Sequence, residues 1–375
     1  MRGGEYPRVV STALWGVKNR ADPGERGGGR GGWALTGGPA LAIVTAPVRP
    51  PVRPASLLLT LLLPLLALAA PPSAVKRGER RQETEAVIAG LIRGGAVPAA
   101  ISRLRFLGEE AYAAEELSIA LRRESNERIR RNLAAVLAGL ESRAAEPALG
   151  RLTIDADSAV RMYAAQGLAR LGSRNTGVLL PLLEDKSSGV RREAAKALGA
   201  SRSPKVGKAL VKAAKAEQDL EVRAALLAAV GESGDVKQAA ALKGFLSSDS
   251  ETTRFAAARG LCLLGSPDGF AFAGKLLGSQ DRFVRRQGLA LYEGVSAKKA
   301  SPALKPLLED DDRTLAAGAA RILYQGGDAS MLDWLVLASW NAKADAKLAY
   351  EKELETLQLR DDQRKAILRR AGVAP

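Results

Sequence analysis

Between residues 124 and 327 the apolar positions recur with two periods at once. Within each helix-sized segment they lie three or four residues apart, which predicts amphipathic α-helices. The whole arrangement then returns at spacings of 31, 30, 32, 31, 31 and 31 residues. A fixed period of roughly 20–50 residues is the signature of stacked repeats. The equivalent positions, which we call anchors, are Arg130, Arg161, Arg191, Arg223, Arg254, Arg285 and Ala316.

Three columns of the repeat predict the buried face of its main helix, helix B. They lie one residue before the anchor, three after it and seven after it, so steps of four keep them on one side of the helix. Small residues in the middle column would let neighbouring helices approach closely. The columns are Ile129, Val160, Val190, Val222, Thr253, Val284 and Leu315; Leu133, Ala164, Ala194, Leu226, Ala257, Gly288 and Ala319; and Leu137, Leu168, Leu198, Val230, Leu261, Tyr292 and Leu323.

Polar residues and glycines mark the expected ends of helix B. Four residues before each anchor lies a favoured N-cap type, namely Asn126, Asp157, Ser187, Asp219, Ser250, Asp281 and Asp312. Glycines that follow helix B are expected to terminate it, namely Gly172, Gly199, Gly231, Gly265, Gly294 and Gly326. A shorter apolar helix A precedes helix B, as in 178–183, 206–216, 236–246, 270–277 and 303–308.

These patterns predict an all-α fold, an α-solenoid of stacked antiparallel helix pairs with a period of about 31 residues. One helix pair cannot bury its apolar face alone, and stacking solves this problem. We assign residues 75–340 to the solenoid, with an imperfect first unit at 82–122, and residues 341–375 to charged C-terminal capping helices. Aromatic residues make up only 4% of the chain, which suits closely packed helices rich in Ala and Leu.

Two stretches carry a family resemblance, from Ser158 to Ala165 and from Ser188 to Gly199. They resemble HEAT-like repeats of the phycobilisome-lyase type, and the resemblance extends over residues 124–327. It implies a solenoid in which helix B lines the concave surface. It also implies a ladder in which acids of the A–B turns bind the anchor arginines across repeat boundaries. The ladder residues would be Arg130, Arg161, Arg191, Arg223, Arg254 and Arg285 with the acids Asp155, Asp185 and Glu217, and Asp249 lies five residues before Arg254.

The first 74 residues differ in composition from the repeats. Residues 1–52 are rich in Gly, Arg and Pro, which predicts a disordered segment. Residues 53–74 combine a basic residue, the apolar stretch 57–70 and an Ala-Leu-Ala ending, which predicts a signal peptide. We therefore expect an exported protein of the periplasm or cell envelope, with translation starting near Val48 or Val52. The alternatives are an uncleaved membrane anchor at 57–70 or a buried helix of the first repeat.

Composition argues against catalysis. The chain has no histidine, so imidazole bases and His-ligated metals are excluded, and its single cysteine, Cys262, is expected to be a small apolar helix residue. Deoxyhypusine hydroxylase resembles this architecture but needs His-Glu motifs that this chain lacks. We expect no enzyme activity, cofactor, metal or small-molecule substrate. The net charge of +15 is compatible with nucleic acid, anionic lipid or acidic protein and selects none of them.

The positions one and five residues after the anchor share a face of helix B away from the buried stripe. We interpret this face as the binding surface of a scaffold that holds a protein partner. The alternatives are a basic groove for nucleic acid, an enzyme similar to phycobilin lyases, or an ordinary solvated face. The candidate partner-binding residues are Arg131, Met162, Gln166, Arg192, Lys196, Phe255, Arg259, Arg286 and Arg321.

Overall fold

The computed structural model of the protein describes residues 77–373, and this part of the chain consists of helices without a β-strand. The segment 1–52 and the signal segment 53–74 lie outside the described residues, so those predictions are not tested. The predicted all-α solenoid of neighbouring helix pairs is confirmed. No helix within residues 77–373 is both long and apolar enough to cross a membrane.

Helix B of each repeat begins where the sequence predicts. The predicted cap residue occupies the N-cap in all seven repeats, and six of the seven side chains accept a first-turn backbone N–H, with Ser187 as the exception. The seven B helices are α5 (Glu127–Gly139), α7 (Ser158–Arg170), α9 (Ser188–Ala200), α11 (Leu220–Ser233), α13 (Glu251–Leu264), α15 (Arg282–Ala290) and α17 (Arg313–Gln325).

Most A segments divide into a short α-helix and one or two 3-10 turns, but α14 is a continuous α-helix of 11 residues and is longer than α15, which has 9. Pro181 and Pro306 lie near the start of such segments, where a residue without a backbone N–H interrupts the α-helical bonding pattern. The A elements are η2 (Arg143–Ala145) with α6 (Glu146–Leu152), α8 (Thr176–Leu179) with η3 (Leu180–Glu184), η4 (Pro204–Val206) with α10 (Gly207–Ala216), η5 (Val236–Gln238) with α12 (Ala239–Lys243) and η6 (Gly244–Ser247), α14 (Pro267–Leu277), and α16 (Ala297–Leu304) with η7 (Lys305–Glu309).

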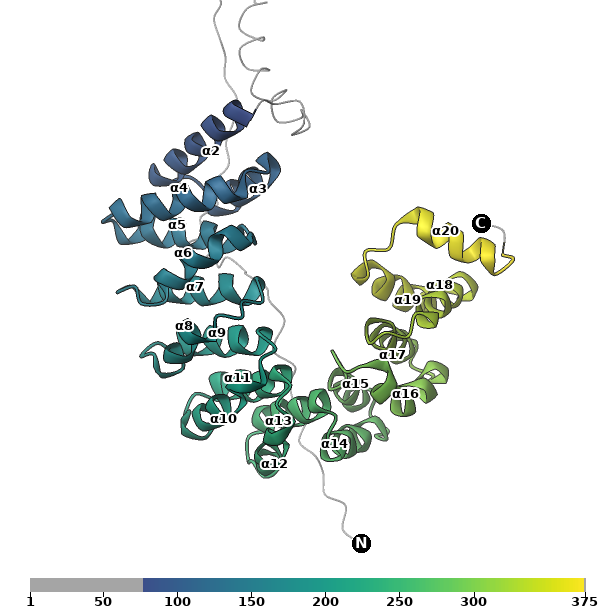
Figure 1. Ribbon diagram of the computed structural model, residues 1–375. Helices are drawn as coiled ribbons and strands as arrows, with labels where there is room; N and C mark the ends of the chain where they lie inside the picture. Colours follow the sequence, from purple (N-terminus) through teal and green to yellow (C-terminus); the bar gives the residue numbers. More distant parts are fainter. Residues whose placement is uncertain (1–76, 374–375) are drawn as a thin grey trace, which may run out of the picture. The chain divides into compact units, whose positions relative to one another are not determined.

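The predicted stripe of helix B forms the core. The column from Leu137 to Leu323 is fully buried in every repeat. Consecutive B helices pack on one another, while α10, α12, α14 and α16 lie on one side of α11, α13, α15 and α17 (Figure 1). The exception is the step from α13 to α15, which are joined mainly through α14. Two apolar clusters, one ending at Leu264 and one beginning at Ala258, meet at this step.

The prediction that Gly199 and Gly231 terminate helices is wrong. Both lie inside B helices, where the absence of a side chain lets the next repeat approach. A Cβ on Gly231 would lie 2.5 Å from the Cα of Gly260 in α13. Gly172, Gly265 and Gly294 do have positive φ angles at the ends of their helices.

Helices flank the repeats at both ends of the described chain. The N-terminal end holds α2 (Arg77–Ile92), α3 (Val97–Leu107) and α4 (Glu110–Arg123). The C-terminal end holds α18 (Ser330–Asn341), α19 (Ala344–Thr356) and α20 (Asp361–Arg370), so the segment predicted as capping helices contains α19 and α20. Arg321 of α17 pairs with Glu353 of α19 and with Glu293, which ties the last repeat to the C-terminal helices.

Candidate partner-binding surface

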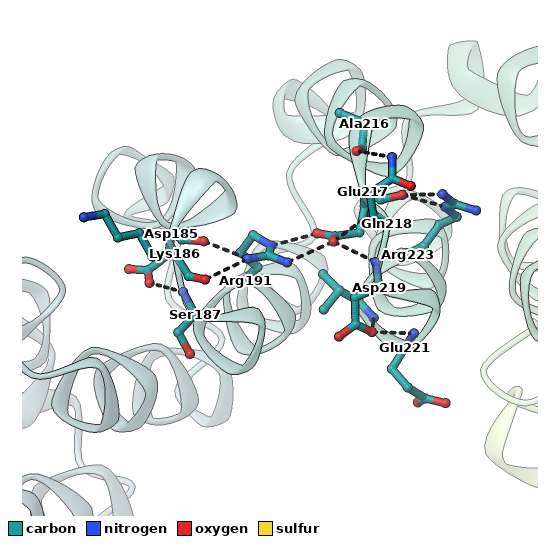
Figure 2. A network of polar contacts seen from close by, with 11 residues as sticks. Asp185, Lys186, Ser187, Arg191, Ala216, Glu217, Gln218, Asp219, Glu221 and Arg223 are labelled. Carbon is teal, nitrogen blue, oxygen red and sulfur yellow. Dashed lines mark hydrogen bonds and ion pairs between the residues drawn. The ribbon is translucent and has the colours of Figure 1, made fainter.

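Arg191 illustrates how an anchor arginine holds two repeats together (Figure 2). It lies in the first turn of α9, and its Nη1 donates to the carbonyls of Asp185 (2.9 Å) and Lys186 (3.3 Å) in the preceding turn. Its Nε and Nη2 donate to the two carboxylate oxygens of Glu217 in the next repeat, at 2.7 and 2.9 Å. One guanidinium therefore closes its own A–B turn and ties that turn to the following one.

The same bridge, which we call a rung, recurs at three other anchors. Each is an arginine that pairs with an acid of the next A–B turn, at the position six residues before the next anchor. The structure thus brings together the predicted residues Arg130, Arg161 and Arg191 with their acids, and adds an acid that the sequence reasoning missed. The three further rungs are Arg130 with Asp155, Arg161 with Asp185, and Arg285 with Asp310.

The ladder is interrupted after two anchors, Arg223 and Arg254. The position that holds the acid elsewhere is Ser248 for the first and Ser279 for the second. Each hydroxyl still accepts the backbone N–H of the next cap residue, as the carboxylates do, but it brings no charge. Within residues 77–373, both arginines donate only to carbonyls of their own turns. Asp249 contributes only its backbone carbonyl and forms no rung.

Pairing sets the protonation of the ladder acids. The hydrogen bond from Arg191 lowers the pKa of Glu217 and outweighs burial, which raises it. Burial is the largest influence on Asp185 and raises its pKa, but the bonds from Arg161 and the Ser187 backbone N–H leave the pKa below its usual value. Both carboxylates are ionised at neutral pH, so these two rungs are ion pairs.

The predicted partner-binding residues lie on the accessible face of helix B, and all are half-buried or exposed. Two of the arginines, however, bind the cap residue of the next repeat. Arg131 Nε donates to Asp157 at 2.6 Å, and Arg286 makes two bonds of 2.9 Å to Asp312. These two side chains join neighbouring repeats, so their charge is largely compensated inside the protein.

Three more basic residues of this face are also paired. Lys196 Nζ lies 2.9 Å from the buried carboxylate of Glu193, and Arg192 Nε lies 3.4 Å from the same group. Arg321 carries the two carboxylate partners described above. The sequence reasoning missed Glu193 because a single acid inside a basic helix gives no periodic signal.

The other predicted positions are Met162, Gln166, Phe255 and Arg259. Phe255 packs edge-to-face on Phe272 of α14, with ring centroids 5.8 Å apart. In the fourth repeat the equivalent positions are Ala224 and Ala228, so the middle of the face is lined by small side chains. The face of helix B therefore mixes apolar residues with compensated charges.

Burial holds two ionisable side chains, Cys262 and Tyr292, in their protonated forms. Burial raises the pKa of the Cys262 thiol to about 12, which keeps it protonated at neutral pH. Burial likewise raises the pKa of Tyr292 to about 12. In the described part of the chain no group of three or more His, Cys, Asp or Glu side chains could hold a metal ion.

The sequence reasoning also missed a lysine-rich surface on the A elements. Its strongest signal is in α10 and the turn before it, where Lys205, Lys208, Lys212 and Lys215 follow one another at steps of three, four and three residues. All four are exposed, whereas Leu210 faces the core. The spacing could have revealed a basic stripe on one side of a helix.

The match to a known family agrees with this architecture. The HEAT repeat family matches residues 114–178, 155–231, 178–261 and 208–293. The complex of CpcE and CpcF of phycocyanin lyase from Nostoc sp. PCC7120 matches with 20% identity and a TM-score of 0.46, over 64% of this chain and 94% of that chain. Human deoxyhypusine hydroxylase matches with 17% identity and a TM-score of 0.30, over 66% and 97%.

A designed armadillo repeat protein matches with 16% identity and a TM-score of 0.36, over 47% of this chain and 97% of that chain. No curated protein matches the chain. These structural likenesses concern the fold alone. The repeat period, the capped B helices and the family match agree: residues 114–293 of this chain are HEAT repeats.

Proposed function

We propose that this protein is a non-catalytic scaffold that binds a protein partner along the accessible face of its B helices, the concave side of a HEAT-type stack. The observation that carries the proposal is the charge compensation of this face. Arg131, Arg192, Lys196, Arg286 and Arg321 all have carboxylate partners inside the chain. A partner there meets a mixed surface of apolar and polar groups.

This composition favours a protein partner over a nucleic acid. A surface that binds the phosphate backbone needs uncompensated Lys and Arg, because release of counterions supplies most of the affinity. Interfaces between proteins instead combine Met, aromatic and Arg side chains with a polar rim. Met162, Phe255 and Arg259 supply the methionine, the aromatic ring and the arginine of such an interface. Ala224 and Ala228 leave room for an approaching chain.

We further propose that the protein acts outside the cytoplasm, in the periplasm or cell envelope. This part rests on the sequence of residues 53–74 alone. The absence of histidine and the raised pKa of Cys262 support a role without acid–base or thiol catalysis.

The test uses the double variant Ala224→Arg and Ala228→Arg. Arginine fits both positions by register, because other repeats carry Arg192 or Arg286 at the first and Arg259 at the second. Affinity capture from envelope extracts should recover a partner with the wild-type chain and at least tenfold less with the variant. This is the loss expected when the two charges at an interface centre together cost more than about 1.4 kcal/mol.

The matched control is Ala111→Arg with Ala144→Arg, which puts the same charges on exposed positions outside the B helices. This variant should capture the partner as the wild type does. Equal capture by the wild type and the 224/228 variant would refute the assignment of this face, and capture dominated by nucleic acid would refute the class of partner.

A further inference from the structure

The excess positive charge of the second half of the chain lies on the A elements, opposite the B helices. The A elements between residues 204 and 309 contain two acids, Asp268 and Glu309. They contain many more lysines, which are all exposed and which we call the lysine face: Lys205, Lys208, Lys212, Lys215, Lys237, Lys243, Lys275, Lys298, Lys299 and Lys305.

Most of these lysines lack a carboxylate partner, unlike most arginines of helix B. Lys243 pairs with Asp268 at 2.8 Å and Lys305 approaches Asp328 at 3.6 Å. Within the described residues the other lysines of this face have no carboxylate within ion-pair distance. Most positive charges on the accessible face of helix B are thus paired with carboxylates, whereas most of those on the lysine face are exposed to solvent.

The layout of the lysine face is broad. Its lysines come from four successive A elements, α10, α12, α14 and α16, which lie in one layer (Figure 1). Clefts of about 290, 250 and 280 Å³ lie elsewhere, among α18 to α20 and among α2 to α4.

We propose that the lysine face binds the surface of an anionic phospholipid bilayer. A bilayer presents many diffuse negative headgroups in a plane, which suits flexible lysines spread over four repeats. Uncompensated lysines also attract a nucleic-acid backbone, but Phe245, Phe270 and Phe272 in these elements are half-buried and offer no stacking platform for bases. The choice of a bilayer rests on the location outside the cytoplasm given under the proposed function. The exposed Val236 (64%) beside Lys237 adds an apolar contact. The proposal does not depend on which partner helix B binds.

The experiment measures co-sedimentation of the full chain with phosphatidylcholine vesicles that contain or lack phosphatidylglycerol, at about 0.1 M salt, where the screening length is about 10 Å. Binding to the anionic vesicles should exceed binding to the neutral ones. The neutral vesicles also account for any lipid binding by the apolar residues 57–70. Each lysine near the surface contributes about fivefold in affinity. Replacing Lys205, Lys208, Lys212 and Lys215 by Gln should therefore weaken anionic binding by up to roughly 600-fold.

The matched control replaces four exposed lysines outside the face by Gln, namely Lys186, Lys343, Lys347 and Lys352. It removes the same net charge and should retain most of the binding. Equal loss in both variants would overturn the assignment to this face. Equal binding to neutral vesicles would overturn the electrostatic mechanism. Tighter binding to duplex DNA than to anionic vesicles at matched charge would overturn the bilayer as the ligand. Circular dichroism of both variants checks that the helices are intact.

Discussion

Replacing Glu217 by alanine removes one rung of the ladder and tests whether the rungs stabilise the stack. The Glu217 side chain is 7% exposed and accepts two bonds from Arg191, whose side chain is 20% exposed. Its Oε1 also accepts the backbone N–H groups of Gln218 and Asp219 at 3.0 Å. The substitution therefore removes the carboxylate acceptor of the Arg191 guanidinium and of the backbone N–H groups of Gln218 and Asp219.

The expected cost follows from how much of the pair is hidden from water. Removing one partner of a buried ion pair destabilises a protein by about 3–5 kcal/mol. Arg191 keeps two backbone carbonyls as acceptors and is partly hydrated, which favours the lower end. We expect a loss of about 3 kcal/mol in the free energy of unfolding.

The assay combines urea unfolding with hydrogen exchange, because a repeat array can open locally and need not unfold in two states. Exchange should accelerate in α9 and α11, and far less in α17. The control is Asp249→Ala, an exposed turn acid that forms no rung, which should change stability by less than about 0.5 kcal/mol. If the two variants are equally stable, the rungs are incidental surface pairs.

Three further predictions address the same stack. Because the folded pKa of Glu217 is lowered, its rung contributes fully above its usual pKa of 4.5 and is lost as the pH falls, so acid titrations of wild type and Glu217→Ala should converge below that pH. Gly231→Ala would place a Cβ 2.5 Å from the backbone of the next B helix, so it should lower the free energy of unfolding in urea by about 3 kcal/mol. Gly274→Ala has open space around it and should raise that free energy by about 0.5–1 kcal/mol. Ser248→Asp should supply Arg223 with the missing acid and raise stability by about 1 kcal/mol, and no slowing of exchange in α11 and α13 would refute this.

The repeat itself could be predicted because its signals are local and periodic. The cap residues and the buried stripe each recur with the anchor, so chance agreement across seven repeats is small. Asn126 and Asp312, at opposite ends of the series, both cap the helices they were expected to cap. Helix termini and apolar faces follow from chain-local chemistry, which a single sequence displays directly.

The accessible face of helix B could not be predicted as well, because its charges depend on contacts between repeats. Arg131 and Arg286 look like free basic residues in the sequence, yet each binds the cap residue of the next repeat. Gly231 looks like a helix terminator, yet it makes room for Gly260. Residues that meet across a repeat boundary are about 25–35 positions apart, and the one-dimensional pattern of such an array leaves their pairing unspecified.

The interruption of the ladder coincides with a change in packing. Ser248 and Ser279 replace the acids on either side of α13, the two apolar clusters meet at the same helix, and α13 and α15 are joined mainly through α14. Elsewhere, consecutive B helices pack directly and an ion pair spans almost every boundary. A rung orients one turn against the next, so its loss removes a restraint at the place where the helices stop packing directly. The stack is therefore least constrained between α13 and α15, and a partner bound along helix B near Phe255 of α13 would lie beside that boundary.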